Sequence, residues 1–328
     1  MMSGAAAGGI GILGGGAWGC ALAQVAATGH DANRAATFLW ARDAATVAAM
    51  TGTRTAPHLP GIALSPAIHA TSDLADLADC DALLVVVPAA ATAAVLALLA
   101  GQRARPVVLC AKGFGPGGIA LADVAAAALP GWPVALLSGP TFAAEVARGL
   151  PAAATLACAD RGIAEALAAR LSGRAFRLYA STDVVGVGLG GAVKNVLAIA
   201  AGVVTGRGLG ANARAATVTR GFAELVRYGR AVGADPATLG GLSGLGDLIL
   251  TCGPGSRNFA YGDALGRGSV PDAGVTVEGA AAAPILAAAA AARGIELPIA
   301  AAVADLVAGR AEVDAVVDRL MRRPLRGE

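Results

Sequence analysis

The stretch that decides the fold is IGILGGGAWGCALAQVAATG, residues 10–29. Residues 10–13 predict a short buried strand, and the alanine-rich residues after 19 predict a helix. The six residues that join them, GGGAWG at 14–19, match the pattern G-x-G-x-x-G. The pattern is weak on its own in a chain with 46 glycines, but here it has the preceding strand and the following helix that it requires.

Each glycine of this pattern has its own expected use. Gly14 makes the tight turn, Gly16 lets the backbone approach a pyrophosphate, and Gly19 lets the helix pack closely on the strand. The helix N-terminus adds free N–H groups and a partial positive charge, which favour a bound phosphate. The turn therefore predicts a dinucleotide site, and the alternative is an ordinary glycine-rich turn.

Short apolar runs alternate with alanine-rich helical runs through the first half of the chain. The alternation is typical of βαβ units, and runs that are apolar throughout are typical of parallel strands buried on both faces. The expected strands are residues 10–13, 36–40, 82–87, 106–110, 133–138, 153–158 and 175–179.

After about Asp183 the strand pattern stops and helical segments follow, among them residues 193–205 and 213–232. We therefore expect a Rossmann-like, doubly wound, mostly parallel α/β sheet in residues 1–188, which binds the dinucleotide. Residues 189–328 are expected to form an all-α domain that holds the substrate and the catalytic groups.

The end of the second expected strand bears on the choice of cofactor. NAD-selective sites usually carry an acid there, about 20 residues after the glycines, to hold the ribose 2′-OH. This chain has LWARD at 39–43, so Arg42 comes first and Asp43 follows. Arg42 is suited to pairing with a 2′-phosphate, and the alternative is an exposed arginine at a strand end. The expected cofactor is therefore NAD or NADP.

Charge and hydropathy exclude several classes of partner. The 328 residues carry 25 basic and 23 acidic side chains, interspersed, for a net charge of +2. This balance argues against nucleic acid or an anionic membrane surface. Residues 82–102 and 124–144 are uncharged over about the length of a membrane helix, but each stretch contains proline and changes its period partway, which argues against membrane insertion.

Cysteine usage and the start of the chain indicate the compartment. Five scattered cysteines without a CxxC pair argue against a disulfide framework or a metal site, and for a reduced protein in the cytoplasm. The first nine residues, MMSGAAAGG, predict a flexible leader without the basic and apolar regions of a signal peptide.

Only two of the 25 basic residues are lysines, Lys112 and Lys194. Arginine stays protonated in proteins, whereas a buried lysine can titrate near neutral pH. Hydride transfer from a secondary alcohol needs a base for the hydroxyl proton, and a second cation nearby lowers the pKa of a lysine. Lys194 with Lys112 fits that scheme, and the alternative is that two basic positions kept lysine by chance.

Most of the remaining candidate polar groups lie in GLSGLGDLILTCGPGSRNFAYG, residues 241–262. The carboxylate of Asp247 is suited to orienting Lys194, or else it caps a helix. The residues GPGSRN predict a turn that opens a helix, whose start is either a phosphate site or a plain helix cap. The side chains offered by the segment are Asp247, Thr251, Ser256, Arg257 and Asn258.

Taken together, these blocks resemble the bacterial NAD(P)-dependent glycerol-3-phosphate dehydrogenases, which serve glycerophospholipid synthesis. The matching blocks run in the family's order over nearly the whole chain, and several are highly specific. They are GGGAWGCALA, LWARD, LLVVVP, AKGFG, SGPTFAAEVARGLP, GVGLGGAVKNVLAIAAGVVTGRGLGANARAATVTRG, GLSGLGDLILTC, SRNFAYG and TVEG. The resemblance implies an enzyme that interconverts sn-glycerol 3-phosphate and dihydroxyacetone phosphate with NAD or NADP, with a homodimer as a possible assembly.

The resemblance also implies the roles of single residues. The catalytic group would be Lys194 as general base, with Lys112 and Asp247. The residues around the substrate and its phosphate would be Lys112, Gly139, Thr141, Lys194, Asn195, Asp247, Thr251, Ser256, Arg257 and Asn258. The cofactor would contact Gly14, Gly16, Ala17, Trp18, Gly19, Arg42, Lys112, Ala143, Arg257, Thr276 and Glu278.

Three features depart from the family's pattern. His58 stands where an aromatic residue is expected before Leu-Pro, Thr276 opens the block TVEG, and residues 253–255 form a short Gly-Pro-Gly loop. These departures leave the cofactor preference and the geometry of that loop open.

Two other functions remain as alternatives. Another lysine-dependent β-hydroxyacid dehydrogenase would space its lysine and asparagine four positions apart, whereas Lys194 and Asn195 are adjacent. A non-catalytic dinucleotide sensor would need the glycine turn but not the lysines, the aspartate and the phosphate site together.

Overall fold

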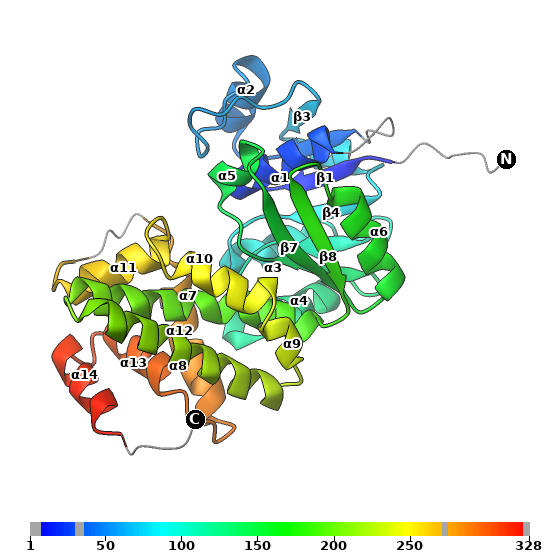
Figure 1. Ribbon diagram of the computed structural model, residues 1–328. Helices are drawn as coiled ribbons and strands as arrows, with labels where there is room; N and C mark the ends of the chain where they lie inside the picture. The colour runs from blue at the N-terminus through cyan, green and yellow to red at the C-terminus, as the bar shows by residue number, and fades with distance from the viewer. Residues whose placement is uncertain (1–7, 30–35, 271–274, 324–328) are drawn as a thin grey trace.

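The computed structural model describes residues 8–29, 36–270 and 275–323, and the first seven residues of the predicted leader lie outside them. The described chain forms a sheet domain followed by a domain of packed helices (Figure 1). The strand pattern stops at Ser181, as the sequence predicts, and every later element in the described part is helical.

Eight strands form one sheet, in the order β3-β2-β1-β4-β5-β6-β7-β8. All neighbouring pairs are parallel except β6 and β7, so the predicted mostly parallel sheet is confirmed. The strands are β1 (Ile10–Leu13), β2 (Thr37–Trp40), β3 (Ile68–Thr71), β4 (Ala82–Val85), β5 (Val107–Leu109), β6 (Val134–Ser138), β7 (Ala152–Cys158) and β8 (Phe176–Ser181).

Strand β3 is absent from the strands expected on sequence. It lies at the edge of the sheet, pairs only with β2, and buries only Ile68. An edge strand of this kind lacks the continuous apolar run that marks a strand buried on both faces.

Helices cover both faces of the sheet. Apolar side chains of α1 (Ala17–Thr28) and α6 (Arg161–Leu171) pack in the core on one face, and those of α3 (Ala89–Ala97) and α4 (Leu121–Ala128) pack in the core on the other. The remaining elements of this domain are α2 (Ala44–Gly52), α5 (Ala143–Ala147), and the 3₁₀ turns η1 (Leu74–Leu77) and η2 (Pro116–Gly118).

The order of the strands determines where a ligand site forms. The chain reverses its direction of progress across the sheet between β1 and β4, and ligands of such sheets bind beyond the carboxyl ends of the strands at this switch point. Strand β1 leads into the glycine turn, β5 leads towards Lys112, and β6 leads into Gly139. Because these strands are parallel, the three segments lie at one edge of the sheet.

The helical domain is built around α7 (Val184–Gly206), which starts nine residues before the helix expected from 193. The predicted domain boundary after residue 188 lies inside α7, where the core changes: Val187 packs in the core of the sheet domain and Leu189 in that of the helices. The other helices are α8 (Gly210–Ala231), α9 (Pro236–Leu239), α10 (Asp247–Thr251), α11 (Arg257–Gly266), α12 (Glu278–Ala291), α13 (Pro298–Val307) and α14 (Val313–Met321).

Among the described residues, α7 alone has the length and hydropathy of a membrane-spanning helix. However, 83% of its most apolar 18-residue window is buried inside the protein. A core helix of a soluble protein passes the same length test, so this feature is weak evidence for a membrane span.

Candidate active site

Two lysines and an aspartate meet between the two domains. Asp247 Oδ1 lies 2.7 Å from Lys194 Nζ, and Asp247 Oδ2 lies 2.7 Å from Lys112 Nζ. Lys112 Nζ also donates to the Gly139 carbonyl at 2.9 Å, and Lys194 Nζ donates to Thr251 Oγ1 at 2.8 Å. The fold thus joins Lys112 and Asp247, which are 135 positions apart in the chain.

The surroundings of Lys194 favour its neutral form. Its side chain is 8% exposed, that of Asp247 is 1% exposed, and that of Lys112 is 14% exposed. Burial, together with the smaller effect of the Lys112 charge, lowers the pKa of Lys194 to about 8, although Asp247 acts in the opposite direction. A group with this pKa can both accept and donate a proton near neutral pH.

A turn of π-helix, η3 (Leu242–Gly246), leads directly into Asp247. Turns of π-helix are rare in proteins, and those that occur are often found at functional sites. The turn packs against α7 at a glycine, because a Cβ on Gly190 would stand 2.6 Å from the carbonyl oxygen of Ser243. Asp247 does not cap α10, since Gly246 is the N-cap residue and both carboxylate oxygens of Asp247 bind lysines.

A chain of amide hydrogen bonds continues the site from α7 to α11 and α12. Asn258 donates from Nδ2 to Asn195 Oδ1 at 2.9 Å, and Asn195 donates from Nδ2 to Glu278 Oε2 at 3.2 Å. The backbone N–H of Gly279 donates to Asn258 Oδ1 at 2.8 Å. Burial raises the pKa of Glu278, against the charges of Lys112 and Arg257. Asn195 Nδ2 also donates to the backbone carbonyl of Lys112 at 3.3 Å, so the amide and carboxylate groups connect to the lysine pair.

The start of α11 lies beside this network. Ser256 caps the helix, because its Oγ accepts from the N–H of Phe259 at 3.3 Å, and Arg257 and Asn258 form the first turn. Ser256 is therefore the N-cap residue of α11, which is compatible with either alternative. A helix start that carries an arginine also suits a phosphate group.

The glycine turn after β1 has the geometry of a dinucleotide fingerprint. Gly14 has a φ of +133°, and a Cβ there would stand 2.2 Å from the carbonyl oxygen of Val86. A Cβ on Gly19 would stand 1.8 Å from the carbonyl oxygen of Gly14, so α1 could not pack as closely with any other residue. Apart from its chain neighbours, no atom of the described residues lies within 4 Å of a Cβ on Gly16, which leaves room for a ligand at the helix start.

The other residues expected around the cofactor and substrate lie at the starts of helices or close to the lysines. The indole of Trp18 packs edge-on against Phe176, with ring centroids 6.4 Å apart, and Ala17 opens α1. Ala143 opens α5, and Thr276 is an exposed residue just before α12. Thr141 Oγ1 donates to the Gly139 carbonyl at 3.1 Å.

The two candidate ribose contacts at the end of β2, Arg42 and Asp43, have different surroundings. Arg42 is exposed, whereas Asp43 is the N-cap of α2 and accepts from the N–H of Thr46 at 2.8 Å and from its hydroxyl at 2.6 Å. The carboxylate of Asp43 is therefore engaged within its own helix.

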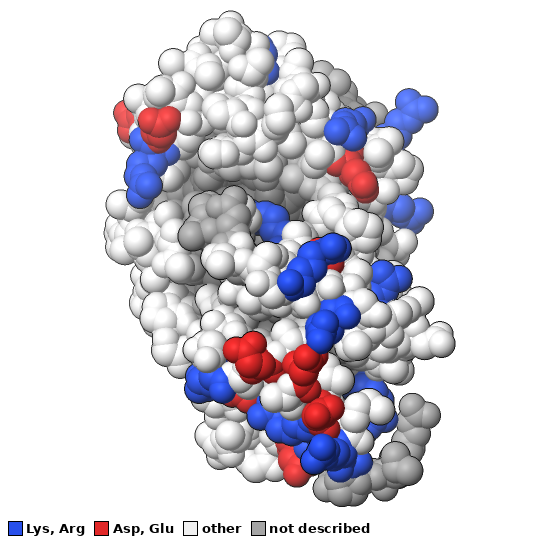
Figure 2. All heavy atoms as spheres, turned by 90° about the vertical axis from the view of Figure 1, so that its left-hand side faces the viewer, with Lys and Arg blue, Asp and Glu red and all other residues white. Residues whose placement is uncertain are grey.

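One face of the molecule is hollowed between the sheet domain above and the helical domain below (Figure 2). Basic atoms lie at the floor of the hollow. The upper half of this face is mostly uncharged, and acidic and basic side chains intermix over the lower half (Figure 2).

Comparison with known proteins identifies the family. Residues 9–164 match the model for the N-terminus of NAD-dependent glycerol-3-phosphate dehydrogenase, and residues 183–318 match the model for its C-terminus. The chain belongs to the NAD-dependent glycerol-3-phosphate dehydrogenase family. The resemblance drawn from the sequence motifs is thereby confirmed.

Relatives cover nearly the full chain. Glycerol-3-phosphate dehydrogenase (NAD(P)+) of Methylobacterium radiotolerans is 55% identical over 97% of this chain and 98% of its own length. The enzyme of the same name from Azorhizobium caulinodans is 56% identical over the same shares. The crystal structure of glycerol-3-phosphate dehydrogenase from Coxiella burnetii matches with a TM-score of 0.90 at 36% identity, over 96% of this chain and 99% of that one.

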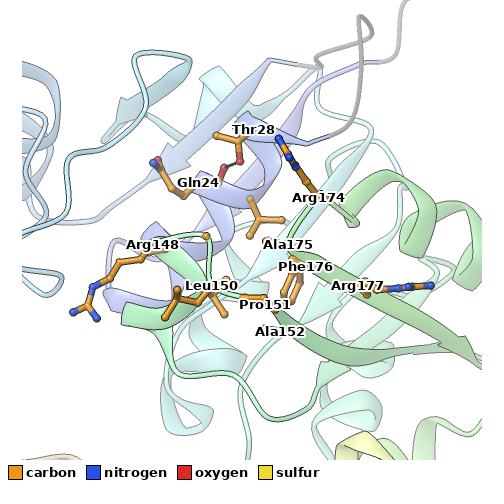
Figure 3. A pocket seen from close by; sticks show the side chains of 15 residues that line it. Gln24, Thr28, Arg148, Leu150, Pro151, Ala152, Arg174, Ala175, Phe176 and Arg177 are labelled. Carbon is orange, nitrogen blue, oxygen red and sulfur yellow. Dashed lines mark hydrogen bonds between the residues drawn. The ribbon is translucent and has the colours of Figure 1, made fainter.

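This member of the dehydrogenase family also has a separate cavity of about 610 Å³ on the sheet domain (Figure 3). It is formed by α1, the segment from α5 to β7 and the start of β8, and none of its residues belongs to the lysine network. Arg148, Arg174 and Arg177 border it around the apolar Leu150 and Phe176, and the described residues that line it include no acid (Figure 3).

Several glycines of this family member were not singled out by the sequence patterns. Gly190 receives the π-turn, and a Cβ on Gly191 would stand 2.8 Å from Ser138 Oγ and 3.4 Å from Lys112 Cγ. The side chain of Lys112 therefore packs against α7 at Gly191. The signal was available in the sequence as the cluster of glycines directly before Lys194, but its meaning depends on which segments pack there.

Proposed function

We propose that this protein interconverts sn-glycerol 3-phosphate and dihydroxyacetone phosphate by hydride transfer to and from NAD or NADP. The observation that carries the proposal is Lys194, a buried lysine whose pKa is lowered to about 8. It lies near a helix start suited to phosphate and is connected through Asp247 and Lys112 to the sheet domain. The near full-length relatives of the same family support this activity.

The hydrogen bonds of Lys194 leave the right atom free for acid/base work. A neutral amine has two N–H donors and one lone pair. Asp247 Oδ1 and Thr251 Oγ1 each accept one N–H of Lys194, so the lone pair is left for the proton of the substrate hydroxyl. In the reverse direction the protonated amine donates its third N–H to the carbonyl oxygen and then transfers that proton.

Lys112 is suited to holding the substrate. Its ammonium group has three N–H donors, of which Gly139 O and Asp247 Oδ2 accept two. The third is available to an oxygen of the substrate. Asp247 keeps both lysine heads in place, and its negative charge offsets part of their mutual repulsion.

The phosphate of the substrate is assigned to the start of α11. Ser256, Arg257 and Asn258 form this helix start, and Asn195 fixes Asn258 through a hydrogen bond. Arginine and the N–H groups of a helix start bind phosphate through charge-assisted hydrogen bonds. We expect Arg257 to contribute most of the charge here.

The glycine turn and its neighbours fit a dinucleotide. Gly14 and Gly19 form a cradle that a Cβ would fill, and the space at Gly16 is open. When bound, the oxidised cofactor would supply the hydride acceptor for alcohol oxidation, and the reduced cofactor would supply the hydride for ketone reduction. The residues that would hold it are Gly14, Gly16, Ala17, Trp18, Gly19, Arg42, Lys112, Ala143, Arg257, Thr276 and Glu278.

Absorbance of the reduced nicotinamide tests the proposal. We expect the purified protein to oxidise NADH or NADPH with dihydroxyacetone phosphate, and to reduce NAD or NADP with glycerol 3-phosphate. A non-catalytic sensor would bind the cofactor without turnover. Another β-hydroxyacid dehydrogenase would act on hydroxy acids that lack phosphate, and either result would overturn the assignment.

The proposed setting is glycerophospholipid synthesis in the cytoplasm, with glycerol 3-phosphate as the product supplied. All five cysteines are free and buried, which is consistent with a reducing compartment. A homodimer and the absence of membrane insertion stay predictions. Light scattering after size-exclusion chromatography and fractionation of cell membranes would test them.

A further inference from the structure

Helices α7 and α11 contact each other backbone to backbone. At each contact glycine, a Cβ would stand 2.1 to 2.3 Å from a carbonyl oxygen of the opposite helix, a distance that real Cβ atoms essentially never show. The glycines are spaced four positions apart on both helices and are Gly202, Gly206, Gly262 and Gly266. Small residues at this spacing let two helices approach more closely than any other side chain allows.

The two helices run side by side in one register. The glycines of α11 face Ile199 and Val203 of α7, so partners differ by 63 positions: 262 − 199 = 63 and 266 − 203 = 63. The same difference, 258 − 195 = 63, relates the hydrogen-bonded pair Asn258 and Asn195. The asparagine pair therefore lies one helical turn from the nearest glycine contact, in the same register, and it is part of the candidate active site.

The reactive ends of the site are attached to these two helices. Lys194 directly precedes Asn195 on α7, and Arg257 directly precedes Asn258 on α11. The start of α12 closes the third side, because a Cβ on Gly279 would stand 2.4 Å from the carbonyl oxygen of Asn195. Any change in the spacing of α7 and α11 therefore changes the separation of Lys194 and the start of α11.

We propose that the interlocked glycines set the distance between the base and the phosphate site, and so select a substrate with a single methylene between its carbonyl and its phosphate ester. This inference rests on the proposed function. A substrate must reach Lys194 with its carbonyl oxygen and the start of α11 with its phosphate at the same time. Packed backbones do not deform continuously, and a misplacement of about 1 Å can cost on the order of 10²-fold in rate.

The first test compares alanine variants on two substrates. Gly262→Ala, one turn from Asn258, should lower kcat/KM for dihydroxyacetone phosphate by roughly 10- to 100-fold. Gly266→Ala, two turns away, should lower it less. Dihydroxyacetone has no phosphate to reach the start of α11, so its much lower kcat/KM should change less than about threefold, since no anchored distance is lost. Gly52→Ala is the matched control, because Gly52 ends α2 and, beyond its own helix and chain neighbours, no atom of the described residues lies within 4 Å of its Cβ.

The second test needs only the wild-type protein. The homologue 4-hydroxy-3-oxobutyl phosphate has one more methylene between carbonyl and phosphate. A fixed distance predicts at least about tenfold lower kcat/KM for the homologue than for dihydroxyacetone phosphate. Gly262→Ala, if it folds, should narrow that difference.

The outcomes separate the distance proposal from the proposed function. Equal losses on both substrates in the alanine variants would show general damage to the fold and overturn the proposal. Equal use of the homologue and dihydroxyacetone phosphate by the wild type would overturn it as well, even if no variant folds. A wild type without activity on dihydroxyacetone phosphate would instead overturn the proposed function itself.

Discussion

The glycine turn after β1 and the lysine network around Asp247 build binding surfaces in opposite ways. The turn works by leaving side chains out, since neither Gly14 nor Gly19 has room for a Cβ. The network works by burying charge, since Lys112 and Lys194 share the carboxylate of Asp247. A buried charge that loses its partner is costly, whereas a backbone turn depends on few contacts beyond its own segment. The two regions should therefore respond independently to substitution.

The largest expected effect comes from removing the base while keeping its charge. Lys194→Arg should lower kcat by roughly 10² to 10⁴-fold, because a guanidinium does not give up a proton to become the base that the alcohol needs. Affinity for NADH, measured by fluorescence titration, should stay within about threefold of wild type, since the glycine turn is untouched. A variant that keeps kcat would remove Lys194 from the role of base, and a parallel loss of NADH affinity would contradict the independence of the two regions.

The next effect concerns the phosphate. Arg257→Ala should lower kcat/KM for dihydroxyacetone phosphate by roughly 10- to 150-fold, the value of about 1.5–3 kcal/mol for one hydrogen bond to a charged group. Dihydroxyacetone should respond much less. Arg267→Ala, at the other end of the same helix and paired with Asp263, is the control. Equal losses on both substrates would assign Arg257 to the structure or the cofactor instead.

The difference between the regions also explains what the sequence could predict. The glycine turn, its strand and its helix lie within 20 consecutive residues, so a local pattern defines them. Strand β3 was not predicted, because it pairs with a single neighbouring strand and buries only Ile68. The first nine residues of α7 were not predicted to be helical, because glycine disfavours helix. In the structure, packing of these glycines against η3 and Lys112 overrides that preference.

The residues of the lysine network could be listed from the sequence, but their geometry could not. The rarity of lysine and the family motifs indicated Lys112, Lys194 and Asp247. One carboxylate, that of Asp247, bridges both lysines, and a turn of π-helix leads into this residue. The sequence patterns used above do not predict such a turn. The interlocked glycines of α7 and α11 have a visible spacing, yet only the packed structure shows which carbonyl groups they face.

A smaller effect is expected at the nucleotide end. Arg42→Ala should raise KM for NADPH by roughly tenfold, the value of one charged hydrogen bond, and should change KM for NADH little. The reason is that Asp43, the other ribose candidate, is engaged in capping α2. Asp43→Asn, which keeps a side-chain oxygen for the cap, is the matched control. A parallel rise for both cofactors would indicate that Arg42 stacks on the adenine, and no rise would exclude it from the site.

The smallest effect is a displacement of the pH profile. Lys194 must be neutral to accept the alcohol proton, so kcat for glycerol 3-phosphate oxidation should rise with pH through a midpoint near 8 and level off at higher pH. It must be protonated to donate, so kcat for ketone reduction should fall above the same pH. The charge of Lys112 lowers the pKa of Lys194, and Lys112→Met should therefore raise that pKa.

Both pH profiles of Lys112→Met should move to higher pH by roughly one unit, the effect of one nearby like charge. Saturating substrate is needed because Lys112 is also expected to bind it, and the midpoint of kcat is independent of a loss in affinity. A shift in pKa moves the midpoint of each profile and leaves the plateau value of kcat unchanged. A loss of catalytic power would instead lower the plateau. An unmoved midpoint would mean that burial alone sets the pKa of Lys194, and a shift to lower pH would contradict the lysine pair as its cause.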